Sequence, residues 1–255
     1  MAEIGLCLSG GGARGLAHLG VLQALDEMGV KPAMISGTSA GAIAGALYAM
    51  GLPPRDILEQ VRTKSVFDVF KLALGKSGLS EMAYLRKILE KNCQNDDFKT
   101  LEIPFTACVS ELRSGRAEMI SEGSIVDAVI ASASIPIIFE PVEKDGKLYV
   151  DGGVLNNLPI EPLKEKNLRI IGVNINVHGE NDKLPNKMKH VAERIFELSL
   201  WYPTKKRFEE CDVQIDVTGA FSYGLFDFNK GEELFEIGYK AAKEKQDDIE
   251  SLMEE

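Results

Sequence analysis

The first fifty residues alternate between short apolar runs and longer stretches with helical spacing. Residues 4–8 form an almost wholly apolar run stopped by glycines, which is typical of a strand buried on both faces. Residues 15–28 place leucines and a methionine at helical spacing and stop at Gly29. Residues 33–36 and 40–50 repeat the strand and helix. This order predicts parallel strands joined by right-handed crossovers.

The rest of the chain continues the mixture of strands and helices. Further strands are predicted at 104–111, 116–120, 136–141, 147–150, 168–175 and 212–217, with a hairpin turn at Asp145-Gly146. Further helices are predicted at 125–134, 187–200 and 231–253. We see no internal repeat and no low-complexity linker, so the 255 residues are expected to form one domain.

Residues 53–98 differ from this alternation because they show short helices and few strand signals. An apolar cluster lies at Val66, Phe67, Val69, Phe70, Leu72 and Leu74, just before the Gly-Lys-Ser-Gly break at residues 75–78. Core packing is the ordinary interpretation of such a cluster. The alternative is a helical cap over an apolar pocket.

Charge narrows the range of partners. With 29 basic and 39 acidic residues, the formal net charge is −10, so the chain offers no broad basic surface to nucleic acid. Lys205, Lys206 and Arg207 form a local basic cluster that is interpreted as a solvated helix turn, with transient contact with a membrane surface as the alternative.

The four cysteines are too far apart in sequence for a metal or redox pair, and Cys7 and Cys108 are expected to be buried. The start of the chain shows no signal-peptide pattern. These features predict a cytoplasmic protein with reduced thiols.

A glycine-rich loop at residues 9–15, Ser-Gly-Gly-Gly-Ala-Arg-Gly, directly follows the first strand. Its backbone N–H groups and the helix N-terminus behind them form a cradle for negative charge. Gly10, Gly12 and Gly15 also fit the dinucleotide fingerprint, but the second strand ends without the acidic residue that a ribose requires. The cradle is therefore interpreted as an anion site other than a nucleotide site.

The second strand leads into Gly37-Thr38-Ser39-Ala40-Gly41, a G-x-S-x-G sequence before a helix. A serine on such a turn is held in strained dihedral angles, and Gly37 and Gly41 relieve the crowding around it. The alternative, a simple serine N-cap, explains neither Gly37 nor the cradle. Since neighbouring parallel strands end in one crevice, Ser39 is expected to face the N–H groups of Gly11 and Gly12.

The residues alone offer two candidates for the base that would activate Ser39. Of the three histidines, His18 is expected to be a packed or hydrogen-bonded helix residue and His190 to be at the surface. His178 follows a predicted strand and is the one serious histidine candidate. Asp151, in Asp-Gly-Gly after an apolar strand, is the competing candidate, although Asp-Gly is also a common turn.

Together, the blocks at residues 10–15, 37–41 and 151–153 resemble the patatin-like phospholipase family, as does the stretch at 131–141. The resemblance extends from residue 4 to about residue 159. It implies a three-layer α/β/α fold with a mostly parallel central sheet. It also implies a Ser39–Asp151 dyad, an oxyanion hole at Gly10, Gly11 and Gly12, and support from Arg14, Gly37, Gly41 and Gly152.

The resemblance implies an esterase acting on acyl esters or phospholipids, without cofactor or metal; the sequence also shows no D-x-D-x-D-G calcium loop. Two alternatives stay open. The same site could transfer the acyl group to an acceptor other than water. The chain could also be a non-catalytic protein whose C-terminal helix docks a partner, although a packed terminal helix is the ordinary interpretation.

Overall fold

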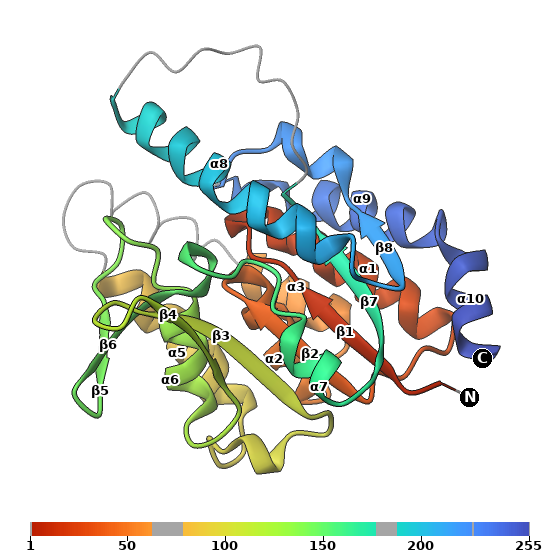
Figure 1. Cartoon of the computed structure of the whole chain (residues 1–255), viewed down its shortest axis with the longest axis horizontal. Coiled ribbons are helices and arrows are strands. Elements are labelled where there is room, and N and C mark those ends of the chain that lie inside the picture. The colour runs from red at the N-terminus through yellow and green to blue at the C-terminus, as the bar shows by residue number, and fades with distance from the viewer. Residues whose placement is uncertain (1, 63–78, 177–187, 226, 255) are drawn as a thin grey trace.

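The computed structural model describes residues 2–62, 79–176, 188–225 and 227–254. Within these ranges the chain forms an eight-stranded sheet with the order β5-β6-β3-β2-β1-β7-β8, and β4 pairs with β3 outside that order (Figure 1). The strands are β1 (Ile4–Leu8), β2 (Met34–Thr38), β3 (Phe105–Glu111), β4 (Arg116–Ile120), β5 (Val142–Lys144), β6 (Lys147–Asp151), β7 (Arg169–Asn174) and β8 (Val213–Asp216).

The centre of the sheet is parallel and one side of it is antiparallel. Strand β1 pairs in parallel with β2 and β7, β2 pairs in parallel with β3, and β7 in parallel with β8. The pairs β3–β4, β3–β6 and β5–β6 are antiparallel. The predicted mostly parallel sheet is confirmed.

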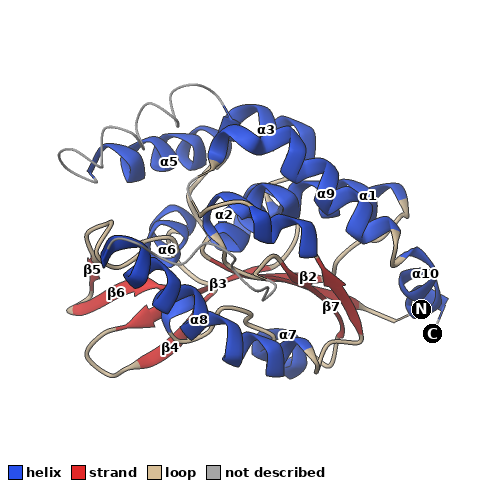
Figure 2. Ribbon diagram, turned by 90° about the horizontal axis from the view of Figure 1, so that it is seen from above, coloured by secondary structure: helices blue, strands red, loops and turns tan. Residues whose placement is uncertain are grey.

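Helices cover both faces of the sheet (Figure 2). The α-helices are α1 (Leu16–Glu27), α2 (Ala40–Ala49), α3 (Pro54–Arg62), α5 (Leu79–Asn92), α6 (Ile125–Ser132), α7 (Glu161–Glu165), α8 (Met188–Phe208), α9 (Gly231–Lys243) and α10 (Gln246–Glu254). Helices α1, α2, α3, α5, α6 and α9 lie on one face and α7 and α8 on the other, which gives the expected three layers. None of the helices in the described ranges combines the length and the apolar character needed to cross a lipid bilayer.

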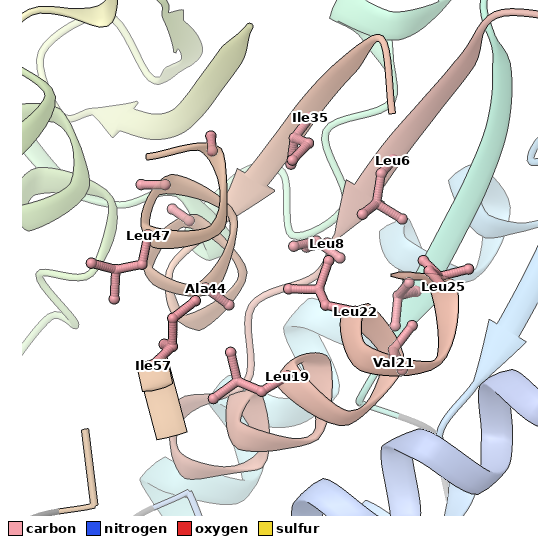
Figure 3. Packing of buried hydrophobic residues seen from close by; sticks show 14 of the residues in the cluster. Leu6, Leu8, Leu19, Val21, Leu22, Leu25, Ile35, Ala44, Leu47 and Ile57 are labelled. Carbon is pink, nitrogen blue, oxygen red and sulfur yellow. The ribbon is translucent and has the colours of Figure 1, made fainter. Parts of the chain in front are cut away.

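Alternation along the central strand β1 creates a core on each face of the sheet. Leu6 and Leu8 pack into the larger core with α1, α2 and α3 (Figure 3). Cys7 points to the opposite face, where it packs with Leu163 of α7 and Phe208 of α8. Because both faces are covered, the strand needs apolar residues at consecutive positions, which explains its unbroken apolar run.

Several predicted elements have different limits in the structure. Residues 136–139 form turns instead of an extended strand, and Ile137 there has a φ of 73°. The helix predicted to end at residue 200 continues to Phe208, so the basic cluster lies in its last turn, as predicted. The predicted helix 231–253 is two helices, α9 and α10.

The residues described between positions 53 and 98 contribute to the core. Ile57 and Leu58 of α3 and Leu89 of α5 are fully buried. The apolar cluster from Val66 to Leu74, for which a cap was the alternative, lies outside the described residues. Helix α9 packs along α1, and Leu234 and Phe235 of α9 are buried in the larger core, which confirms the packed-helix interpretation of this segment.

Candidate active site

The candidate site lies where two strands meet end to end along one edge of β3. Strand β2 runs parallel to β3 and ends with Thr38 opposite Cys108. Strand β6 runs antiparallel to β3 and ends with Asp151 opposite Val109. Since β4 pairs with the same residues of β3, it occupies the other edge, and the carboxyl ends of β2 and β6 point toward each other. This topology brings residues 39 and 151 together.

Ser39 occupies the turn between β2 and α2 in a strained conformation. Its φ is 54° and its ψ is −119°, a combination that residues with a side chain seldom adopt. A Cβ on Gly37 would lie 2.6 Å from the carbonyl oxygen of Gly41, and a Cβ on Gly41 would collide with the carbonyl oxygen of Leu8. The predicted strain at Ser39 is confirmed, and both glycines allow the close backbone approach that the turn requires.

Asp151 is hydrogen-bonded directly to the serine. Ser39 Oγ donates to Asp151 Oδ2 over 2.6 Å, and the backbone N–H of Gly153 donates to Asp151 Oδ1 over 2.7 Å. A Cβ on Gly152 would collide with the carbonyl oxygen of Cys108, so the turn after Asp151 also depends on glycine. The Asp-Gly-Gly sequence thus fixes the carboxylate against the serine.

Burial changes the acidity of this carboxyl group. Asp151 is 2% exposed, and burial raises the pKa of its carboxyl from 3.8 to about 6, while hydrogen bonds from Ser39 and Gly153 oppose the shift. Because a buried carboxylate is poorly solvated, its charged form is disfavoured and its affinity for a proton rises. At neutral pH Asp151 is therefore a stronger base than an exposed aspartate.

Ser132 of α6 supports the serine turn. Ser39 N–H donates to Ser132 Oγ over 2.9 Å, and Ser132 Oγ donates to the carbonyl oxygen of Cys108 over 2.6 Å. The neighbouring carbonyl of Ser134 accepts the N–H of Asp151 over 2.9 Å. Sequence reasoning assigned Ser132 no role, although it lies in the 131–141 stretch that carried part of the resemblance.

The glycine loop after β1 lies beside Ser39, and its N–H groups differ in their partners. A Cβ on Gly10 would lie 3.1 Å from Ser39 Cβ. Gly10 N–H donates to the carbonyl oxygen of Asn157 over 3.2 Å. Within the described part of the chain, the N–H groups of Gly11 and Gly12 have no hydrogen-bond acceptor. Within the described residues, the loop therefore has one engaged N–H group, at Gly10, and two without a protein acceptor, at Gly11 and Gly12.

Arg14 is buried and contacts the loop and the C-terminal third of the chain. Its Nε donates to the carbonyl oxygen of Tyr223 over 2.7 Å, and its Nη1 donates to Asn176 Oδ1 over 3.3 Å. The guanidinium also lies over the ring of Phe221, 5.5 Å from its centroid. Arg14 therefore connects the loop to segments for which sequence reasoning found no motif.

Of the three histidines, the structure describes the side chain of His18. His18 is fully buried in α1, burial lowers its pKa to about 4, and its Nε2 lies 2.7 Å from the carbonyl oxygen of Ser9. The prediction of a packed, hydrogen-bonded helix residue is confirmed. His178 and the side chain of His190 lie outside the described residues.

Metal binding and cysteine reactivity depend on which side chains lie together in the described residues. Within them, no group of three or more His, Cys, Asp or Glu side chains is arranged to hold a metal ion. Cys7, Cys108 and Cys211 are buried free thiols, and Cys93 is a partly buried one. The expected burial of Cys7 and Cys108 is confirmed.

Comparison with known proteins identifies relatives of this chain. Lysophospholipase NTE1 of Cryptococcus neoformans var. neoformans serotype D is 35% identical over 72% of the chain and 12% of its own length. An uncharacterized NTE family protein of Mycobacterium bovis is 31% identical over 68% of the chain and 49% of its own length. The chain thus spans about half or less of the length of these relatives.

A solved structure shares the fold. The crystal structure of VipD from Legionella pneumophila matches with a TM-score of 0.56 and 16% sequence identity, over 96% of this chain and 67% of that one. The family model for patatin-like phospholipases matches residues 6–164, which include the glycine loop, Ser39 and Asp151. The chain belongs to the patatin-like phospholipase family.

Proposed function

We propose that this protein is a serine esterase that hydrolyses acyl esters of lipids, of the phospholipase A or lysophospholipase type. Ser39 is the nucleophile and Asp151 the base. The observation that carries the proposal is the 2.6 Å hydrogen bond from Ser39 Oγ to Asp151 Oδ2, made across the junction of β2 and β6. Family membership and a relative named as a lysophospholipase support the same chemistry.

In the first half of the reaction, Ser39 Oγ attacks the ester carbonyl carbon and its proton moves to Asp151 Oδ2. The carbonyl oxygen becomes an oxyanion. When the tetrahedral intermediate collapses, the bond to the alcohol oxygen breaks, and protonated Asp151 gives its proton to that oxygen. The free alcohol leaves, and the acyl group stays on Ser39.

In the second half, a water molecule attacks the acyl carbon and Asp151 accepts its proton. Collapse of this second intermediate breaks the bond to Ser39 Oγ, which regains a proton from Asp151, and the fatty acid is released. A carboxylate with a pKa of about 6 suits both roles because it is ionised at neutral pH and still binds a proton in the intermediate.

The oxyanion is assigned to the N–H groups of Gly11 and Gly12. Both meet no acceptor within the described residues, whereas Gly10 N–H already donates to Asn157. Gly10 then contributes as the residue that lets the loop approach Ser39. Donors aimed at a developing oxyanion contribute about 3 kcal/mol each to transition-state stabilisation.

The proposed substrates are phospholipids or lysophospholipids, so the protein is also proposed to contact membrane surfaces transiently. The basic last turn of α8 is the candidate contact, although two of its cations already have acidic neighbours. Lys205 lies 3.9 Å from Glu209, and Arg207 lies 2.8 Å from Glu161.

The test is a chain-length series of acyl esters, lysophospholipids and phospholipids, with products analysed with and without an added alcohol acceptor. Wild-type protein is expected to release free fatty acid and Ser39→Ala to release none. Ser121→Ala, at an exposed serine, is the matched control and should behave as wild type. Equal hydrolysis by wild type and Ser39→Ala would refute the proposal, and transfer of all acyl groups to the added alcohol would favour an acyltransferase.

A further inference from the structure

Asn176 is a buried residue that lies two positions after the end of β7 and outside the segment matched by the family model. Its side-chain amide lies between Arg14 and the glycine loop. Asn176 Nδ2 donates to the carbonyl oxygen of Gly10, and Asn176 Oδ1 accepts from Arg14 Nη1 over 3.3 Å. The amide thus connects a cation to the backbone next to Ser39.

The orientation of this amide is determined by its two neighbours. A guanidinium can only donate and a carbonyl oxygen can only accept, so Oδ1 must face Arg14 and Nδ2 must face Gly10. Arg14 is itself held by the carbonyl oxygen of Tyr223 over 2.7 Å. The backbone N–H of Asn176 donates to Asn174 Oδ1 over 3.0 Å, which fixes the other end of the residue.

Holding the Gly10 carbonyl has a direct consequence for Gly11. The Gly10 carbonyl and the Gly11 N–H belong to one planar peptide unit, and in a trans peptide they point in opposite directions. Fixing the oxygen on the Asn176 side therefore aims the Gly11 N–H away from Asn176. Glycine residues on both sides would otherwise leave this peptide unusually free to rotate.

The preceding peptide unit is already fixed at both ends. His18 Nε2 lies 2.7 Å from the carbonyl oxygen of Ser9, and Gly10 N–H donates to the carbonyl oxygen of Asn157 over 3.2 Å. The Gly10–Gly11 peptide is the next unit, and within the described residues Asn176 is its hydrogen-bond partner. The loop is thus anchored as far as Gly10, and the orientation of the first free N–H depends on Asn176.

We propose that Asn176 is a positioning residue that orients the Gly11 N–H for oxyanion stabilisation. It acts through the Gly10 carbonyl and touches no substrate. This inference rests on the proposed function, because Gly11 has this role only if Ser39 forms a tetrahedral intermediate. A purely structural Asn176 would instead contribute to stability without affecting the rate of the chemical step.

The test compares Asn176→Asp with wild type. The aspartate has the same shape and keeps an acceptor for Arg14, but it presents an oxygen to the Gly10 carbonyl where the amide presented a donor. We expect kcat per active site, titrated with a fluorophosphonate, to fall about 10- to 100-fold, somewhat less than the loss of a whole oxyanion donor. KM should stay near the wild-type value, and a lower melting temperature from the two facing oxygens does not affect kcat per titrated site, because titration counts folded protein only.

Two further variants separate the loss of the amide from the effects of an added charge or of misfolding. Asn176→Ala removes the amide without adding a charge and should lower kcat per titrated site to a similar extent, which covers the case in which Asn176→Asp does not fold. Asn92→Asp in α5 is the matched control, since Asn92 Nδ2 bonds Gln60 and Ile88 away from the site. It should keep wild-type kcat.

A trifluoromethyl ketone inhibitor provides an independent readout, because its adduct with Ser39 carries an oxyanion. Its affinity should fall in Asn176→Asp in parallel with kcat/KM. This inference alone would be overturned if both Asn176 variants kept wild-type kcat and inhibitor affinity while the wild-type activity was lost in Ser39→Ala. A wild type without any Ser39-dependent reaction would overturn the proposed function and this inference with it.

Discussion

At the scale of single residues, the central feature is a carboxylate that is both buried and hydrogen-bonded to a serine. Desolvation raises the pKa of Asp151 to about 6, and hydrogen bonds from Ser39 and Gly153 oppose the shift. This environment makes the carboxylate a better proton acceptor, and it also makes the charged form costly to bury. The first effect bears on catalysis and the second on stability.

The first effect predicts the pH dependence of the reaction. Because Asp151 must be ionised to accept the serine proton, kcat/KM should fall about tenfold per pH unit below a midpoint near the pKa of about 6. A pH–rate profile on a soluble ester measures this. A midpoint below pH 5 would contradict burial as the source of the base strength.

The second effect predicts that Asp151→Asn is more stable than wild type at pH 8. The folded-state pKa of about 6 lies above the usual 3.8, so the stability contributed by protonated Asp151 is fully present below pH 3.8 and is lost as the pH rises through 6. The neutral asparagine avoids this loss, which is about 3 kcal/mol for a pKa raised from 3.8 to about 6. Urea unfolding at pH 8 and pH 4 should show the gain at pH 8 and a smaller difference at pH 4. A variant less stable than wild type at pH 8 would argue against a costly buried charge.

At the scale of elements, the site depends on the close approach of α2 to the end of β1. A Cβ on Gly41 would collide with the carbonyl oxygen of Leu8, and a Cβ on Gly15 would collide with Ala40. These contacts press the serine turn against the glycine loop. The distance between the proposed nucleophile and the proposed oxyanion donors is therefore set by backbone packing between these two elements.

This packing predicts that Gly41→Ala destabilises the protein and lowers its activity. Relieving the collision with backbone atoms requires α2 to move, at a cost of about 1–3 kcal/mol. Gly224→Ala is the control, because a Cβ there would lie 3.3 Å from the exposed carboxylate of Asp227 and would meet no backbone atom at collision distance. Thermal unfolding and ester hydrolysis measured on both variants test this, and a Gly41→Ala protein with wild-type stability and rate would be inconsistent with it.

The elements were predictable where glycines or turn residues mark their ends. The limits predicted for β1 and β4 agree with the structure to the residue, and the hairpin at Asp145-Gly146 is present, both residues having positive φ. The break between α9 and α10 has no glycine or proline to signal it, because residues 244 and 245 are Glu and Lys. Residues 136–139 form turns although their apolar side chains suggested a strand, since periodicity alone does not distinguish the two in so short a run.

The site was predictable where its residues lie in glycine-containing motifs, and not elsewhere. Gly10, Ser39 and Asp151 lie in glycine-anchored motifs, and such motifs report local backbone requirements. Asn157 and Asn176 lie in no such motif, and their importance depends on which backbone groups face them after folding. Tertiary contacts of this kind leave no periodic or local signal in one sequence.

At the scale of the whole molecule, the site is assembled from segments that are distant in sequence. The parallel order of the central strands followed from the alternation of strands and helices. The sequence did not predict that β2 and β6 pair with the same edge of β3. No local pattern specifies that an antiparallel strand continues where a parallel one stops. This junction is what brings Asp151 to Ser39.

The central claim is that this protein activates Ser39 with Asp151 and without a histidine. The most direct test measures kcat/KM of Asp151→Asn and His178→Ala beside wild type on the same ester. We predict that Asp151→Asn loses about 10²- to 10⁴-fold, the usual contribution of a general base, and that His178→Ala stays close to wild type. An active Asp151→Asn together with an inactive His178→Ala would contradict the account.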